Sequence, residues 1–235
     1  MCKSDFVSGK PYLPQLVPLC CSGSRATVRT GIAGDVLNSP VDDRSALRQR
    51  LKKLRRAVPP AARRAAARAV AQHVRHHFNL RPGLRIAVYA PLPSELDCGP
   101  VAELARRHRC LIYLPRLTDL RRRRMRFIEA SGPMRRNHLG ILEPIHLRQL
   151  SARRLDLVFV PLVGFDAKGE RLGMGAGYYD RAFHFLRHRR FWRHPRLVGL
   201  AYSFQQVPHI EGASHDVRLS AVITEKGPIK CNTGY

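Results

Sequence analysis

Apolar runs and amphipathic segments alternate along the chain from about residue 42 onwards. The run from Leu157 to Val163 is rich in β-branched residues and predicts a strand buried on both faces, ended by the turn at Pro161 to Gly164. Shorter apolar segments predict strands at 84–90, 110–114, 196–202 and 221–224. Helical periodicity is found at 42–58, 61–78, 101–108 and 179–189. The alternation predicts an α/β fold: a single-domain three-layer sandwich with a mostly parallel central sheet and helices on both faces.

The first predicted helix has one apolar stripe, which recurs at intervals of four, three and four residues: Leu47, Leu51, Leu54 and Val58. Asp42 or Asp43 caps its start. Arg44 and Arg48 are four residues apart, so both project from one face, about one turn from each other. From the residues alone, an ordinary solvated basic face explains the two arginines.

The organisation of the chain follows from where this patterning begins and ends. Residues 1–40 lack periodicity and contain several prolines and glycines, so we expect a disordered extension or an upstream start-site misassignment. We expect one domain at 41–228 and a tail at 229–235, since 235 residues suit a single α/β domain. Prolines interrupt the apolar segment 12–21, and no apolar run approaches the ~20 residues of a membrane span.

The composition is strongly basic, with 42 Lys and Arg against 17 Asp and Glu and a formal net charge of +25. Such an excess favours anionic partners: nucleic acid, an acidic membrane or a polyanionic small molecule. The arginine runs at 121–124 and 187–196 are not interleaved with aromatics in an RNA-binding pattern. We therefore expect a solvated basic surface, with no specific nucleic-acid partner and no membrane partner.

The six cysteines have no metal or redox spacing, which indicates free thiols in a reducing cytoplasm.

A glycine-rich loop follows the central strand. Gly173, Gly175 and Gly177 occupy alternate positions just before a predicted helix start at Tyr178. Without Cβ atoms the backbone N–H groups can converge on an anion, and phosphate is the favoured ligand. A flexible connection explains the same glycines, and the spacing fits neither the Walker pattern nor the dinucleotide fingerprint. The flanks favour phosphate, because Arg171 can add a planar cation and Asp180 a metal-binding carboxylate.

The whole stretch Gly164 to Arg181 reads Gly-Phe-Asp-x-x-Gly-x-Arg-Leu-Gly-x-Gly-x-Gly-Tyr-Tyr-Asp-Arg. It resembles the signature of the 5-formyltetrahydrofolate cyclo-ligases, also called methenyltetrahydrofolate synthetases. The resemblance extends from Asp42 to about Thr224, and the segment 140–144 resembles a structural turn of the family. It implies a ligase that converts 5-formyltetrahydrofolate and ATP to 5,10-methenyltetrahydrofolate, ADP and phosphate.

The implied chemistry is phosphorylation of the formyl oxygen by ATP, attack by N10 of the folate, and expulsion of phosphate. It needs no protein nucleophile, in agreement with the lack of a Ser-His or Cys-His pattern. The implied partners are small molecules, 5-formyltetrahydrofolate and ATP as co-substrate, with Mg²⁺ as cofactor. We expect a cytoplasmic monomer.

The resemblance also implies a role for individual residues. Arg171 and Tyr178 are the catalytic residues, and Asp180 and Asp216 hold the metal. The ATP-binding residues are Arg44, Ser45, Ala46, Leu47, Arg48, Arg171, Leu172, Gly173, Met174, Gly175, Ala176, Gly177, Tyr178 and Tyr179. The substrate-binding residues are Ala90, Glu95, Met174, Gly175, Ala176, Gly177 and Tyr178. Glu95 follows a proline-rich strand end and suits the N–H groups of a pterin, although a helix-capping role explains it equally well from the residues alone.

Two positions depart from the family pattern. Met174 stands where some relatives have a basic or aromatic residue, so a bound phosphate depends more on Arg171. Ala176 stands where many have Gly or Lys, and its methyl group modestly limits backbone approach. Two other functions remain open: a basic RNA-associated protein that has kept the fold and lost turnover, and an ATP-dependent enzyme for another formylated or carboxylated substrate.

Overall fold

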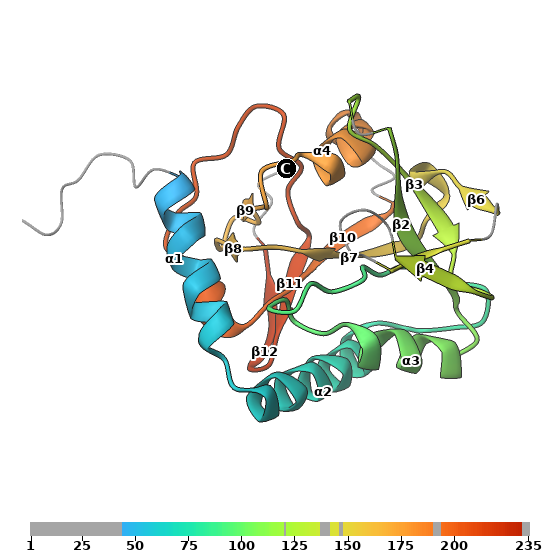
Figure 1. The fold of residues 1–235 in the computed structure, drawn as a ribbon, viewed down its shortest axis with the longest axis horizontal. Coiled ribbons are helices and arrows are strands. Elements are labelled where there is room, and N and C mark those ends of the chain that lie inside the picture. Colours follow the sequence, from blue (N-terminus) through green and yellow to red (C-terminus); the bar gives the residue numbers. More distant parts are fainter. Residues whose placement is uncertain (1–43, 120, 137–141, 146–147, 190–193, 232–235) are drawn as a thin grey trace, which may run out of the picture. The chain divides into compact units, whose positions relative to one another are not determined.

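The computed structural model describes residues 44–119, 121–136, 142–145, 148–189 and 194–231 (Figure 1). The expected disordered extension, residues 1–40, lies outside the described residues, as does the last part of the expected tail. No helix in the described part of the chain is long and apolar enough to cross a membrane.

The central sheet has eight strands among the described residues. Its spatial order is β12 (Gly227–Lys230), β11 (Ala221–Thr224), β10 (Arg196–Leu200), β7 (Leu157–Pro161), β1 (Arg85–Ala87), β2 (Leu111–Asp119), β3 (Arg124–Glu129) and β6 (Gln149–Leu150). The five strands from β11 to β2 pair in parallel, and the outer strands pair antiparallel. Two small hairpins join β4 (Met134–Arg136) to β5 (Leu142–Pro144) and β8 (Gly164–Phe165) to β9 (Arg171–Leu172).

Helices cover both faces of this sheet (Figure 1). On one face, α2 (Pro60–His77) and α3 (Gly99–Arg107) pack on alternate strand residues such as Ile86 and Phe159. On the other, Phe183 of α4 (Tyr178–Phe183) packs with Val158 and Val160. Short 3₁₀ turns at Ala152–Arg154, His184–His188 and Ser203–Gln205 complete the helical segments. Because β7 is buried on both sides, the predicted three-layer α/β sandwich is confirmed.

The helix α1 (Arg44–Ala57) lies against the β8–β9 hairpin and the segment that follows β10. Its inward residues Leu47 and Leu51 join the apolar cluster of Val163, Leu172, Val207 and Ile210. The expectation that Leu54 belongs to the same stripe is wrong, since Leu54 is 47% exposed. Arg55, four residues after Leu51, takes the inward position.

Several element boundaries differ from the sequence prediction. The strand expected to end before Pro115 continues as β2 to Asp119, because pairing with β3 places Pro115 opposite Phe127. The strand expected at 84–90 is only the three residues of β1. The helix expected at 179–189 is shorter, since α4 has six residues and a 3₁₀ turn follows it.

Two further expectations near the ends of elements are corrected by strand pairing. Leu142–Pro144, expected within a turn at 140–144, is β5, while residues 140 and 141 lie outside the described part. The domain end expected after residue 228 falls inside β12, whose ladder with β11 extends to Lys230.

The order of the strands identifies where a ligand would bind. The chain passes from β1 to β2 in one direction across the sheet, and from β7 through β10 to β11 in the other. In open α/β sheets such a reversal leaves a crevice outside the carboxyl ends of the two central strands. Here these ends lead into the loop that carries Glu95 and into the glycine-rich segment after Pro161.

Candidate active site

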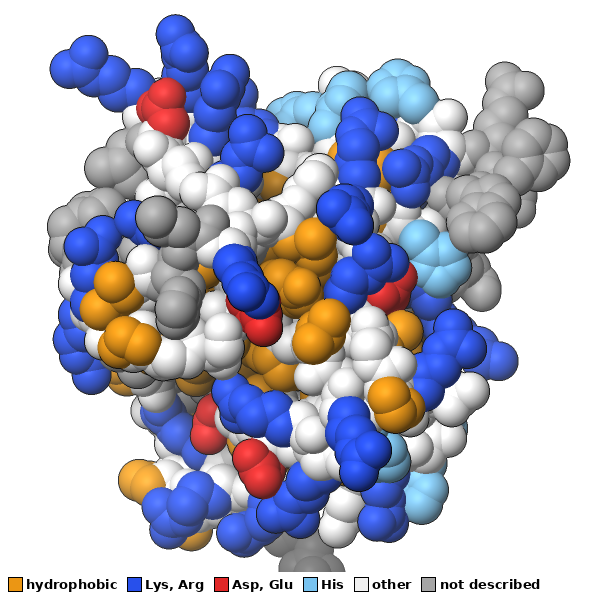
Figure 2. All heavy atoms as spheres, turned by 90° about the vertical axis from the view of Figure 1, so that its right-hand side faces the viewer, with side chains coloured by type: hydrophobic (Ala, Val, Ile, Leu, Met, Phe, Trp, Pro, Cys, Tyr) orange, Lys and Arg blue, Asp and Glu red, His pale blue; other side chains and the backbone are white. Residues whose placement is uncertain are grey.

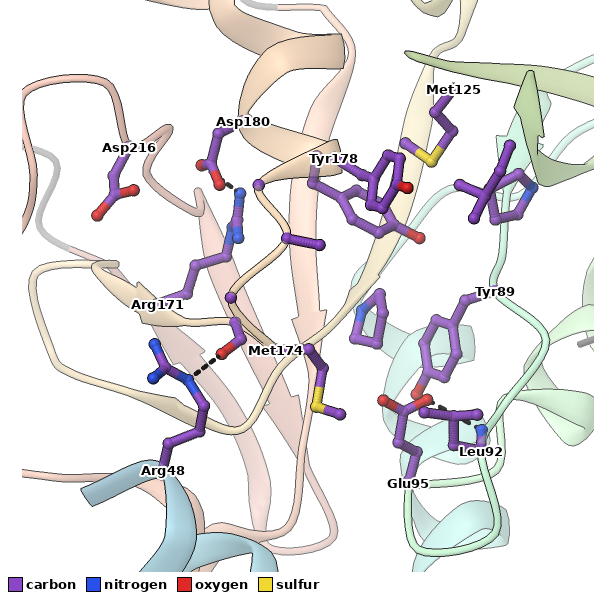
Figure 3. Close-up of a pocket in the computed structure, with 18 of the residues that line it drawn as sticks. Arg48, Tyr89, Leu92, Glu95, Met125, Arg171, Met174, Tyr178, Asp180 and Asp216 are labelled. Atoms are coloured by element: carbon purple, nitrogen blue, oxygen red, sulfur yellow. Dashed lines mark hydrogen bonds and ion pairs between the residues drawn. The ribbon is translucent and has the colours of Figure 1, made fainter. Parts of the chain in front are cut away.

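A cavity of about 680 Å³ lies at this reversal of strand order. Its walls come from α1, the loop after β1, the β2–β3 hairpin, the glycine loop with the start of α4, and the segment before β11. Segments far apart in the sequence therefore meet around one space. Figure 3 shows Arg48, Arg171, Asp180 and Asp216 on one side of it and Tyr89, Leu92 and Glu95 on the other. Met174 and Tyr178 lie between the two groups.

The glycine loop needs glycine for its backbone conformation. Gly175 and Gly177 have φ values of 104° and 68°, in the left-handed region that L-residues rarely adopt. A Cβ atom added at either position would meet nothing within 4 Å, so the need is conformational rather than one of crowding. Because α4 has only six residues, its dipole adds little, and anion binding at this loop would depend on Arg171 and on backbone N–H groups.

Arg171 is the buried cation of the loop, with 6% of its surface exposed. Its Nη2 donates to Oδ1 of Asp180 at 2.5 Å. The same carboxylate oxygen accepts from the backbone N–H of Val217 at 3.1 Å. These two hydrogen bonds hold together three segments: β9, the first turn of α4 and the segment before β11. Arg171 and Asp180 both lie on the cavity wall.

Two arginines of α1 approach the cavity from the other direction. Arg44 Nη2 donates to Oδ2 of Asp216 at 3.1 Å, and that oxygen also accepts from the N–H of Ala213 at 2.9 Å. Arg48 Nε donates to the carbonyl oxygen of Gly173 at 2.8 Å. The spacing of four residues predicted that both would share a face, and the structure places both on the cavity wall. His215 also lines the cavity beside Asp216.

The opposite end of the cavity is built by the proline-rich loop after β1. Glu95 is 8% exposed, and its Oε2 accepts from the backbone N–H of Leu92 at 3.0 Å. Tyr89 is held by a hydrogen bond from its hydroxyl to the carbonyl oxygen of Leu96 at 2.7 Å. Burial raises the pKa of Glu95, while the Leu92 N–H and the nearby Arg55 guanidinium act in the opposite direction.

The structure places most of the predicted site residues on this cavity, but not all. Those that line it are Arg44, Arg48, Ala90, Glu95, Arg171, Gly173, Met174, Gly175, Ala176, Gly177, Tyr178, Tyr179, Asp180 and Asp216. Leu47 and Leu172 instead lie in the apolar cluster beneath α1, and Ser45 and Ala46 are exposed outside the lining. These four adjoin the binding residues in sequence without facing the cavity.

Sequence reasoning missed two groups of residues at the site. Tyr89 lines the end of the cavity that carries Glu95, and Leu117 and Met125 reach the cavity from the β2–β3 hairpin. Arg55 is buried behind Glu95. A usable signal for Arg55 was present, because an arginine four residues after Leu51 interrupts the inward face of α1.

Similarity to known proteins identifies the family of this chain. The sequence model of the 5-formyltetrahydrofolate cyclo-ligase family matches residues 40–225. The chain belongs to this family. Enzymes named 5-formyltetrahydrofolate cyclo-ligase from Haemophilus influenzae and Escherichia coli strain K12 are each 31% identical to it, covering 77% and 74% of this chain and 96% of their own length.

A solved 5,10-methenyltetrahydrofolate synthetase from Aquifex aeolicus is 25% identical and superposes with a TM-score of 0.68, over 82% of this cyclo-ligase family member and 94% of its own chain. The family predicted from the sequence is confirmed, and with it the assignment to ATP-dependent cyclisation of 5-formyltetrahydrofolate.

Proposed function

We propose that this cavity binds ATP and 5-formyltetrahydrofolate together and closes the folate ring to give 5,10-methenyltetrahydrofolate, ADP and phosphate. The observation that carries the proposal is that one cavity has a cationic glycine loop at one end and a buried carboxylate at the other (Figure 3). These two ends suit a nucleotide phosphate and the N–H groups of a pterin.

At the nucleotide end, the phosphates lie along the loop Gly173 to Gly177 and face the cations of Arg44, Arg48 and Arg171. A guanidinium can contact two phosphate oxygens at once, and neutralising charge on the transferred group supplies much of the acceleration in phosphoryl transfer. Arg44 is paired with Asp216, and Arg171 with Asp180. We infer that ligand binding redistributes these ion pairs.

At the folate end, Glu95 accepts hydrogen bonds from pterin N–H groups, with Tyr89 and Ala90 beside it on the wall. Tyr178 lies between the two ends, where the formyl oxygen meets the terminal phosphate. Holding the two reactants in contact converts a bimolecular encounter into a unimolecular step, which is a large part of the catalysis that a protein without a covalent intermediate can supply.

The described side chains suit positioning better than covalent catalysis. Burial raises the pKa of the Cys98 thiol to about 12 and that of the Tyr179 phenol well above its usual range. Both are protonated at neutral pH and are poor nucleophiles. The phosphoryl group passes directly from ATP to the formyl oxygen, N10 attacks the activated carbon and gives up its proton, and phosphate leaves with the oxygen.

Magnesium is a further proposal, and the donor set fits it. Asp180 and Asp216 present hard carboxylate oxygens to the cavity, each held by a backbone N–H. Mg²⁺ in nucleotide sites is commonly bound by one or two carboxylates together with phosphates and water, and the two aspartates and a nucleotide would supply such a set. When bound, Mg²⁺ would neutralise phosphate charge.

We also propose that the protein works as a monomer in the cytoplasm on these small molecules, with no specific nucleic-acid partner. The described cysteines Cys98, Cys110 and Cys231 are free and buried, as expected in a reducing compartment. On the face drawn in Figure 2, Lys and Arg side chains are spread among other types rather than gathered in one patch.

Turnover by the purified protein tests the proposed function. With magnesium, ATP and 5-formyltetrahydrofolate, methenyltetrahydrofolate absorbance and ADP should rise together, and omission of either substrate should abolish both. ADP release with other formylated or carboxylated compounds, but not with the folate, would assign the site to another substrate. Salt-sensitive RNA retention with no folate-dependent ADP release would indicate a binding protein.

A further inference from the structure

The most unusual buried group in the described structure is a guanidinium. Arg55 of α1 is 2% exposed, less than either Arg171 or Glu95. Removing a charge from water is costly unless partners compensate it, and burial accordingly lowers the pKa of Arg55. An apolar side chain would fill this buried position without that cost. The contacts of Arg55 must therefore explain why a charge is placed here.

Those contacts converge on the loop that carries Glu95. Nη1 of Arg55 donates to the carbonyl oxygen of Leu162 at 3.0 Å, and Nη2 donates to Oγ of Ser94 at 3.3 Å. Nη1 also lies 4.0 Å from Oε1 of Glu95. One side chain thus joins α1, the segment leaving β7 and the residue pair Ser94–Glu95.

The position of Arg55 along α1 relates it to the nucleotide end of the cavity. Arg44, Arg48 and Arg55 are separated by four and seven residues, a spacing that keeps them on one face of a helix. The first two contact Asp216 and Gly173, while the third reaches Glu95. A single helix therefore carries cations to both ends of the cavity.

We infer that Arg55 is a positioning residue for substrate recognition: it holds the Glu95 carboxylate against the folate and places a positive charge behind it. This role rests on the proposed function of the cavity. Glu95 accepts a hydrogen bond at Oε2 from the Leu92 N–H, and the guanidinium of Arg55 lies at ion-pair distance, 4.0 Å, from Oε1. A carboxylate held in this way accepts hydrogen bonds in a defined direction.

The electrostatics around Glu95 agree with this geometry. Burial raises its pKa, and the Leu92 N–H and the Arg55 cation lower it. Arg56 and Tyr202 act on Arg55. Asp97 acts on Tyr89 and Cys98. The titratable groups nearest to Glu95 are Tyr89 and Cys98, on its own side, and Tyr179 of α4. Burial keeps all three protonated and neutral at neutral pH. Loss of the Arg55 charge therefore leaves a buried carboxyl that is more readily protonated.

A purely structural role for Arg55 makes a different prediction. If the guanidinium only fastened α1 through Leu162 and Ser94, its loss would lower stability without changing the acid–base behaviour of Glu95. The test must therefore include a measurement on Glu95 itself.

Steady-state kinetics give the first test. We expect Arg55→Met to raise the KM for 5-formyltetrahydrofolate about tenfold at neutral pH, the size expected for a weakened hydrogen bond to a charged group. The KM for ATP and kcat should change much less, and the defect should shrink as pH rises. Arg55→Lys, which keeps the charge, should retain the pH profile of the wild type, and Arg56→Met, at the exposed neighbouring position, should match the wild type throughout.

The second test needs no substrate and so separates this inference from the proposed function. The titration of Glu95 is followed by ¹³C NMR of side-chain-labelled glutamate, with the signal assigned through Glu95→Gln. A higher apparent pKa in Arg55→Met than in the wild type supports the inference, even if the protein proves inactive on folates. An unchanged titration in folded Arg55→Met overturns it. If that variant does not fold, Arg55→Gln, which also removes the charge but keeps polar groups at the position, is titrated in its place: a raised apparent pKa of Glu95 supports the inference and an unchanged one overturns it.

Discussion

The two ends of the cavity are built in opposite ways. At the nucleotide end, arginines are paired with aspartates around a loop whose backbone lies open, as in Arg44 with Asp216 and Arg171 with Asp180. At the folate end, Glu95 is buried, is fixed by the N–H of Leu92 and has Arg55 behind it. At the nucleotide end, the arginines and aspartates can exchange partners when a ligand binds. At the folate end, the carboxylate of Glu95 is buried and keeps a fixed orientation.

The difference fits the two substrates. A triphosphate brings several negative charges, so a site that already contains balanced ion pairs can accept it by exchanging carboxylates for phosphate and metal. A neutral pterin offers directional N–H donors, and a fixed carboxylate discriminates among such donors because an unpaired buried group is costly. The account therefore predicts that variants at the two ends affect different kinetic constants.

The largest expected effect is at the nucleotide end. Arg171→Ala removes the cation beside the transferred phosphoryl group, so kcat should fall by about 10³-fold, with little change in folate affinity. Turnover followed by methenyltetrahydrofolate absorbance gives kcat, and fluorescence titration gives folate binding. Arg187→Ala, at an exposed position beyond α4, is the matched control and should retain activity. An equal loss in both variants would remove the special role of Arg171.

The next effect should be confined to the folate end. Glu95→Gln keeps the shape but replaces a double acceptor by a group that also donates, so the KM for 5-formyltetrahydrofolate should rise about 10- to 100-fold. The proposed contact with the pterin requires the ionised carboxylate, and burial raises the pKa of Glu95. Affinity should therefore weaken as pH falls through that raised pKa, and Glu95→Gln should flatten this dependence. A variant that keeps the same pH profile would contradict the assignment.

A smaller effect should separate the metal from the folate. Asp216→Asn weakens one proposed magnesium ligand and the partner of Arg44, so the magnesium concentration for half-maximal activity should rise about tenfold. The folate KM measured at saturating magnesium should be unchanged. A raised folate KM with an unaltered magnesium requirement would contradict the proposed role of Asp216 as a magnesium ligand at the nucleotide end.

The smallest effect should come from the loop residue that departs from the family pattern. Ala176→Gly removes one methyl group from the cavity wall, so the KM for ATP should change by less than about threefold. A change of more than about tenfold, measured at saturating folate, would mean that this methyl group controls how closely phosphate approaches the loop.

The sequence predicted those parts of the site that depend on local chemistry. The glycine loop, Arg171, Asp180 and Glu95 stand beside recognisable strand ends or turns, and parallel strands bring their carboxyl ends to one edge of a sheet. Arg44 and Arg48 followed from helical spacing once the family pattern was recognised. The glycine loop and these five charged residues all line the cavity.

The remaining features depend on tertiary contacts that no local pattern specifies. Whether Leu54 or Arg55 turns inward is settled by Leu162 and Ser94, which come from distant segments. Strand β2 continues through Pro115 because it pairs with β3. The same pairing brings Met125 of β3 to the cavity wall. The short α4 could not be distinguished from a longer helix by periodicity alone.

A crystal structure of the protein with magnesium, a non-hydrolysable ATP analogue and 5-formyltetrahydrofolate would show where both substrates bind. We expect the terminal phosphate against Gly173 to Gly177 and Arg171, the pterin N–H groups on Glu95, and the formyl oxygen between them near Tyr178. A nucleotide bound outside this cavity, or a pterin that leaves Glu95 without a ligand contact, would contradict the proposed function.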